Sequence, residues 1–114
     1  NRFTYISPTL LDYEVINGLR SALLSNRITR IEMEKTLMLY RETEIERISF
    51  QSILEGALHI AVKTSCSIYD ASYIALAQRQ NCRFYTLDIK LFNKLRPLFP
   101  FVNLLSEEIP EKVT

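Results

Sequence analysis

The sequence is poor in residues on which several large classes of protein depend. Its 114 residues include 2 glycines, 2 cysteines, 1 histidine and no tryptophan. Both glycines, Gly18 and Gly56, fall inside expected helices, so no glycine-rich loop is available to bind the phosphates of a nucleotide. The one histidine, His59, lies in an expected helix with no motif around it that would build a Ser-His-Asp or Cys-His arrangement. The composition therefore disfavours dinucleotide-binding, P-loop and triad-based functions.

The two cysteines, Cys66 and Cys82, are too few and too far apart for a zinc site or a disulfide framework. No apolar run is long enough to span a membrane, and the first residues do not resemble a secretory signal. We expect a cytoplasmic protein with no membrane partner. The 14 Lys and Arg residues nearly balance the 13 Asp and Glu residues, so any contact with nucleic acid must come from a local patch.

The hydrophobic residues, 47% of the chain, recur with periods that alternate between strand and helix. Strong alternation of this kind predicts a single α/β domain over residues 1–114, with a small, mostly parallel sheet and helices on both faces. We expect strands at residues 2–6, 45–49, 83–87 and 102–105, and helices at 8–24, 29–41, 52–64, 70–80 and 88–96.

Three helix starts carry capping signals: Ser7 followed by Pro8, Thr29 with Glu32, and Ser52 with Glu55. Gly18 stands in the middle of the first helix, where glycine is unfavourable. We expect another segment of backbone to approach closely at Gly18.

Two aspartates stand at the places where an α/β sheet binds ligands. Asp70 and Asp88 each lie near an expected helix start, and Asp88 directly follows a strand. Carboxylates at the carboxyl edge of a parallel sheet can converge on one crevice, where they would suit Mg²⁺ or Mn²⁺. The alternative is structural, because aspartate is among the best residues for capping a helix.

Glu14 lies in mid-helix, where it cannot act as a cap. At about 100° per residue it flanks the apolar stripe of its helix, with Asn17 one turn further along the same strip. Asp12 falls about 160° away from Glu14 around the helix axis, so the two cannot point into one site. The alternative for Glu14 is an ordinary solvated residue at the edge of the buried face.

Two segments together resemble the PIN-domain nucleases, and especially the toxins of VapBC-type toxin–antitoxin pairs. The first is SPTLLDYEVINGLR, residues 7–20, which resembles the P-x-L-x-x-x-E-x-x-N-x-L helix of that family. The second is SIYDASYIALAQRQNCRFYTLDIKLFNKL, residues 67–95, which resembles its Y-D-A-x-Y-x-A-L-A and T-x-D-x-x-L stretch. The resemblance implies a three-layer α/β/α sandwich and a metal-dependent endoribonuclease. It also implies a cognate antitoxin, a homodimer and RNA as the substrate.

By motif, Glu14, Asp70 and Asp88 match the acidic residues of the family that bind Mg²⁺ or Mn²⁺ and carry catalysis. Asn17 and Thr86 match polar positions that often line its site.

Two basic residues, Lys90 and Arg83, are expected near the same edge of the sheet, where they could hold substrate phosphates. Ordinary solvated surface is an equally good interpretation of both.

The sequence departs from the family at its start. PIN domains open with a strand that ends in an aspartate, about two dozen residues before the P-x-L helix, but only seven residues precede Pro8 and none is acidic. We therefore expect a PIN-like domain that lacks its N-terminal strand and first acid. The alternative function is a catalytically inactive PIN-like module that binds another protein.

Overall fold

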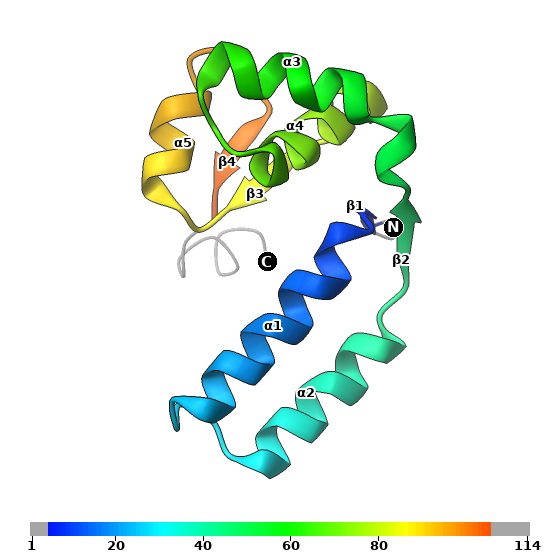
Figure 1. Ribbon diagram of the computed structural model, residues 1–114, viewed down its shortest axis with the longest axis vertical. Coiled ribbons are helices and arrows are strands. Elements are labelled where there is room, and N and C mark those ends of the chain that lie inside the picture. The colour runs from blue at the N-terminus through cyan, green and yellow to red at the C-terminus, as the bar shows by residue number, and fades with distance from the viewer. Residues whose placement is uncertain (1–4, 106–114) are drawn as a thin grey trace, which may run out of the picture. The chain divides into compact units, whose positions relative to one another are not determined.

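The computed structural model of the protein describes residues 5–105. In this range strands alternate with helices, and every strand pairing is parallel, which confirms the α/β class (Figure 1). The chain divides into two compact units, residues 1–52 and 53–114, and each is described by itself. None of the helices within residues 5–105 is long and apolar enough to cross a membrane.

The first unit contains a pair of strands joined by a helical hairpin. Its elements are β1 (Tyr5–Pro8), α1 (Leu10–Leu24), α2 (Arg30–Glu42), β2 (Ile45–Ile48) and the short 3-10 helix η1 (Phe50–Ser52). β1 and β2 pair in parallel, with Tyr5 opposite Ile45 and Pro8 opposite Ile48. Two parallel strands cannot be joined by a tight turn, so the chain crosses over through α1 and α2.

The expected start of the first helix was wrong. Strand β1 continues through Ser7 and Pro8, and the amide of Thr9 donates to the Ile48 carbonyl at 3.1 Å, so the segment remains extended. The fixed φ of proline fits a strand end as well as a first helical turn. Ser7 is buried, and its hydroxyl donates to the Pro8 carbonyl instead of capping α1. Residues 2–4 of the expected strand lie outside the described residues.

The turn between α1 and α2 follows its sequence signals. Asn26 adopts a left-handed conformation with φ of 60°, which asparagine tolerates better than most residues. Thr29 and Glu32 form both hydrogen bonds of the expected capping box, at 3.1 and 2.8 Å. Gly18 did not behave as expected, because a Cβ built on it would meet no atom within 4 Å among the described residues.

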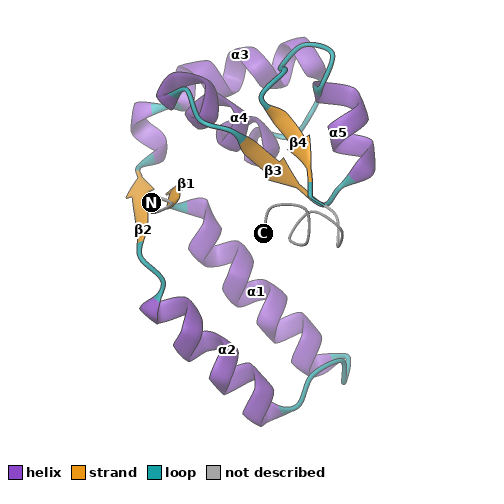
Figure 2. Cartoon of the chain, turned by 180° about the vertical axis from the view of Figure 1, so that it is seen from behind, coloured by secondary structure: helices purple, strands orange, loops and turns teal. Residues whose placement is uncertain are grey.

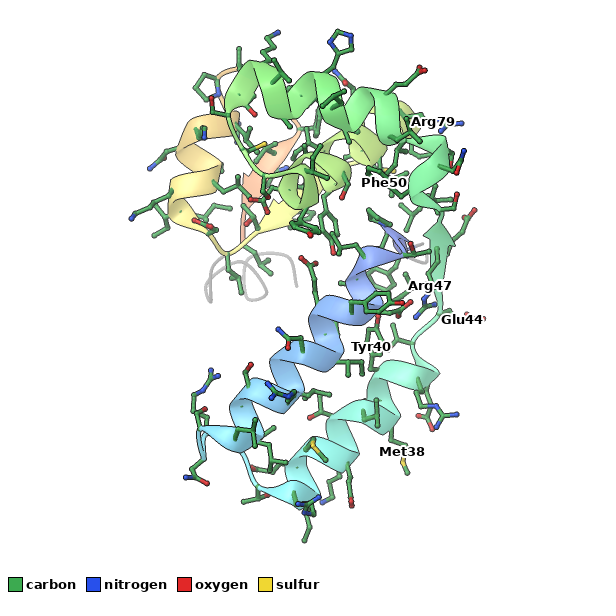
Figure 3. The ribbon with its side chains drawn as sticks, viewed as in Figure 1. Met38, Tyr40, Glu44, Arg47, Phe50 and Arg79 are labelled. Atoms are coloured by element: carbon green, nitrogen blue, oxygen red, sulfur yellow. The ribbon has the colours of Figure 1, made fainter. Side chains whose placement is uncertain are left out.

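The carboxylate of Asp12, on α1, accepts hydrogen bonds from two other elements of the first unit. Asp12 accepts hydrogen bonds from the Tyr40 hydroxyl of α2 at 2.6 Å and from Nε and Nη2 of Arg47, on β2, at 2.7 and 2.8 Å. The Arg47 guanidinium lies 5.9 Å from the centre of the Tyr40 ring, and Figure 3 shows the two side chains close together. These contacts tie three elements of the unit to one side chain.

The second unit contains α3 (Leu54–Thr64), α4 (Ile68–Gln80), β3 (Phe84–Thr86), α5 (Ile89–Leu95) and β4 (Val102–Leu104). β3 and β4 pair in parallel, with α5 as the crossover (Figure 2). The small residues of α4 let it pack closely on α3, where a Cβ built on Gly56 would lie 3.5 Å from the Cβ of Ala75. The largest side chains of this core that are fully buried are Ile74, Leu95 and Val102.

The expected capping box at the start of α3 was wrong. Ile53 occupies the N-cap position, and it offers no side chain that could cap the helix. The hydroxyl of Ser52 donates to the Ser49 carbonyl at 2.8 Å, because residues 50–52 form η1 before the α-helix begins. A serine that closes a local turn is no longer available to cap the following helix.

The contacts of Asp12 predict a pH dependence of stability. The hydrogen bonds from Arg47 and Tyr40 lower the pKa of Asp12 from 3.8 to about 2. A carboxylate whose pKa is lowered on folding contributes stability that is present above pH 4 and is lost as the pH falls toward 2. We expect the Asp12→Asn variant to be less stable than the parent protein at pH 5, with the difference shrinking between pH 4 and 2. Urea unfolding followed by circular dichroism at several pH values measures this, and a difference that is independent of pH would contradict it.

Candidate functional site

Glu14 lies in the second turn of α1, with an exposed side chain. Asn17, one helical turn further on, is also exposed and belongs to the same polar strip. A groove of about 400 Å³ runs beside this strip and is lined by Asp12, Tyr13, Ile16, Asn17 and Arg20. The first unit therefore presents one glutamate and one amide to solvent from neighbouring turns of the same helix.

Asp70 is the third residue of α4, and it is not the cap of that helix. The N-cap is Ser67, whose hydroxyl accepts a hydrogen bond from the Asp70 amide at 3.0 Å. The half-buried carboxylate of Asp70 makes no hydrogen bond to another described residue. The structural alternative that the sequence left open for Asp70 is therefore wrong. The spacing Ser67-x-x-Asp70 is itself a capping signal, and it could have located this helix start.

Asp88 is the N-cap of α5, which agrees with the structural alternative that its position at a helix start left open. Its Oδ1 accepts a hydrogen bond from the Leu91 amide at 3.1 Å, and its own amide donates to Oγ1 of Thr86 at 3.0 Å. Thr86 ends β3, so the structure brings these two candidate residues together at the carboxyl end of that strand. The second carboxylate oxygen of Asp88, Oδ2, has no partner among the described residues.

The direction in which α4 runs determines the end of β3 toward which Asp70 lies. α4 ends at Gln80, β3 begins at Phe84, and the helix and the strand run in opposite directions (Figure 2). The first turn of α4 therefore lies toward the carboxyl end of β3, where α5 begins. Lys90, exposed in the first turn of α5, belongs to this end, whereas Arg83 precedes β3 and lies at its other end.

Neither unit alone contains three or more histidine, cysteine, aspartate or glutamate side chains that could share a metal ion, within the described residues. Asp70 and Asp88 belong to the second unit, and Glu14 belongs to the first. Carboxylate oxygens are the hard ligands that Mg²⁺ and Mn²⁺ prefer. The chemistry of these donors fits such an ion, and Oδ2 of Asp88 is the oxygen that remains available after capping.

Comparison with known families identifies the chain. The sequence profile of the PIN domain matches residues 2–96, which is most of the chain. The chain belongs to the PIN domain family. All three candidate carboxylates of this PIN domain lie inside the matched region, which confirms the family resemblance of the sequence.

Several curated proteins are similar to this PIN domain. A VapC ribonuclease of Mycobacterium bovis and ribonuclease VapC9 of Mycobacterium tuberculosis are each 32% identical to it over 84 residues, 74% of this chain. Ribonuclease VapC3 of Pyrobaculum aerophilum is 30% identical over 93 residues, which is 78% of this chain and 70% of that protein. The matched region spans 65% of the length of the mycobacterial relatives, slightly less than two thirds.

The hydrogen bonds at the two helix starts predict different costs for similar substitutions. We expect Ser67→Ala and Asp88→Ala each to lower the free energy of unfolding by about 1 kcal/mol, because each removes a capping acceptor. Asp88→Asn keeps an acceptor and should cost a few tenths of a kcal/mol at most. Asp70→Asn leaves the cap of α4 in place, so it should cost less than half as much as Ser67→Ala. Urea unfolding measures all four, and equal losses for Asp70→Asn and Ser67→Ala would contradict this assignment.

Proposed function

We propose that this PIN domain is a metal-dependent endoribonuclease that hydrolyses phosphodiester bonds of RNA, and that it is the toxin of a VapBC-type toxin–antitoxin pair. The observation that carries the proposal is the match to the PIN domain over residues 2–96, together with relatives named as VapC ribonucleases. The three acidic residues at the motif positions of the family support it.

In this proposal Glu14, Asp70 and Asp88 hold one or two Mg²⁺ or Mn²⁺ ions. Such an ion, when bound, orients a water molecule, lowers its pKa and neutralises charge on the scissile phosphate. Asp88 can serve because its two oxygens are divided between tasks: Oδ1 accepts from the Leu91 amide and Oδ2 is left for the metal. The amide hydrogen bond also fixes the orientation of the carboxylate before any ligand arrives.

Four polar side chains are proposed to contact the substrate. Asn17, one turn from Glu14, and Thr86, bonded to the Asp88 amide, would line the site. Lys90 lies in the turn that follows Asp88, where its ammonium can hold a phosphate. Arg83 fits this role less well than Lys90, because it stands at the opposite end of β3.

We further propose that residues 1–114 form a single PIN-like domain. Its described strands pair in parallel, β1 with β2 and β3 with β4, as expected for the small parallel sheet of such a domain.

A second candidate function is a catalytically inactive PIN-like module that binds another protein. One observation favours it: Asp88 makes a helix-capping hydrogen bond, which gives this residue a structural role that needs no metal. A third possibility, an anion-binding module that uses its helix N-termini, is opposed by the acidic residues at the starts of α4 and α5.

The proposed protein partners are a cognate antitoxin and a second copy of the chain, as in the family. The helices of the first unit bury no residue. Met33, Leu37 and Tyr40 are half-buried, whereas Met38 is 63% exposed. Ile31, which lies on the same side of α2 as Met38, is 65% exposed. Apolar side chains exposed in a row on one helix face commonly mark a surface that another chain covers.

The nuclease proposal predicts that cleavage of RNA requires the negative charge of the three carboxylates, and that an amide of the same shape cannot replace them. We expect Glu14→Gln, Asp70→Asn and Asp88→Asn each to lower Mg²⁺-dependent cleavage of a single-stranded RNA by roughly 100-fold or more, because an amide is a weaker ligand for a divalent cation. Cleavage followed on a labelled RNA with and without EDTA measures this, and Ser67→Ala is the control for changes in folding. Cleavage that survives all three substitutions would contradict the assignment, and an inert parent protein that still binds a partner would favour the second function.

The partner proposal predicts the effect of charge on the exposed face of α2. We expect Ile31→Glu combined with Met38→Glu to leave folding unchanged, since both side chains are exposed, and to convert a dimer into a monomer or weaken antitoxin binding at least tenfold. Light scattering and titration with the antitoxin measure the two outcomes. A parent protein that is strictly monomeric and binds its antitoxin as tightly after substitution would contradict this use of the surface.

A further inference from the structure

Three elements of the first unit meet at one carboxylate that the proposed mechanism does not use. Asp12 receives the Tyr40 hydroxyl from α2 and two guanidinium nitrogens from Arg47 on β2, at 2.6 to 2.8 Å. The third nitrogen of the Arg47 guanidinium, Nη1, donates a hydrogen bond to the Ile45 carbonyl at 3.0 Å. Asp12, Tyr40 and Arg47 form what we call the Asp12 cluster.

The Asp12 cluster does more to fix geometry than to add stability. The side chains of Arg47 and Asp12 are 35% and 38% exposed, and ion pairs this open to water contribute little to stability on average. Two parallel hydrogen bonds from a planar guanidinium do, however, fix the direction of a carboxylate. Because Asp12 lies in the first turn of α1, the cluster fixes the rotation of that helix about its own axis.

The apolar stripe of α1 is half-buried, at Leu11, Val15 and Leu19. No residue of α1 is buried, so the helix is not locked by side chains enclosed on all sides. Polar contacts with narrow geometric requirements therefore have a large share in setting the angle at which α1 presents its other side chains.

We propose that the Asp12 cluster is a positioning device for Glu14, which it holds at the angle required for metal binding. This inference rests on the proposed nuclease function. Asp12 and Glu14 are two residues apart on α1 and project about 160° from one another, so contacts on one side of the helix determine where the other side points. Arg47 and Tyr40 are positioning residues, since they act through the helix and touch neither metal nor substrate.

Even a small rotation of α1 would displace the Glu14 carboxylate by a distance that affects the rate. A side chain extends to about 5–6 Å from the axis of an α-helix, so a rotation of about 10° moves a carboxylate by about 1 Å. Displacement of a catalytic group by that distance can lower a rate by roughly 100-fold. The loss should appear mainly in kcat and in metal affinity, because Asn17 is the one proposed RNA contact on α1, whereas Lys90 and Thr86 lie on other elements.

The test compares Arg47→Met with a matched control, Arg30→Met, which removes an exposed arginine of α2 outside the cluster. In the full-length protein we expect Arg47→Met to lower kcat by about 10- to 100-fold and to weaken Mn²⁺ binding, measured by electron paramagnetic resonance without RNA, by about 10-fold. The KM for RNA should change by less than about twofold. Arg47→Lys should recover less than half of the loss, because lysine supplies the charge without the fork.

Tyr40→Phe tests the same idea if Arg47→Met folds poorly. It removes one hydrogen bond to Asp12 and keeps the ring beneath the guanidinium, and the expected loss is about 2- to 5-fold in kcat with the same change in Mn²⁺ affinity. Unchanged Mn²⁺ affinity and kcat in both variants, while Glu14→Gln loses both, would overturn the positioning role.

A final measurement separates this inference from the nuclease proposal. The ¹³C NMR signal of the Glu14 carboxylate in the metal-free protein should move in Arg47→Met and Tyr40→Phe and stay in place in Arg30→Met. An unmoved signal overturns the positioning role whether or not the protein cleaves RNA. A signal that moves in a protein that neither binds Mn²⁺ nor cleaves RNA supports the positioning role and refutes the nuclease function.

Discussion

Parallel pairing of short strands is the constraint on which the arrangement of this protein depends. A parallel pair needs a crossover connection, and both pairs obtain it from helices: α1 and α2 join β1 to β2, and α5 joins β3 to β4. Each crossover begins where a strand ends, so the first turns of helices gather at carboxyl ends of strands. Asp88 occupies such a place directly, because it both follows β3 and caps α5. The chemistry proposed for this chain is thus located by the connectivity of its strands.

Much of the local structure could be predicted from short-range signals, and the failures share a physical cause. The capping box of Thr29 and Glu32 was found because both of its partners lie within four residues. Ser7 and Ser52 carry the same kind of signal, yet their hydroxyls bond to the carbonyls of Pro8 and Ser49 in competing local turns. A serine has several nearby acceptors of similar energy, so its neighbours in the strand or turn decide which one it uses.

For the proposed site, the sequence predicted the helix face on which Glu14 lies, but it did not predict the long-range contacts of the same helix. The 100° period of α1 was sufficient to separate Asp12 from Glu14, because that argument needs only the helix. The partners of Asp12 were not predictable, since Tyr40 and Arg47 lie 28 and 35 residues further along the chain. The low helix propensity of glycine led to an expected close contact at Gly18 that the described residues do not contain, because an unfavourable residue does not reveal what lies opposite it.

The two aspartates and the glutamate of the proposed site differ in how near they lie to the N-terminus of a helix. Asp70 and Asp88 lie at helix N-termini, where the aligned peptide dipoles place roughly half a positive charge. This partial charge stabilises each carboxylate, but it also offsets part of the attraction that the carboxylate exerts on a cation. Glu14, in the second turn of a fifteen-residue helix, is farther from such an N-terminus than either aspartate. The dipole of α1 therefore offsets the charge of Glu14 less than the dipoles of α4 and α5 offset those of the two aspartates, so the position that α1 gives to Glu14 becomes the more important variable in the proposed metal site.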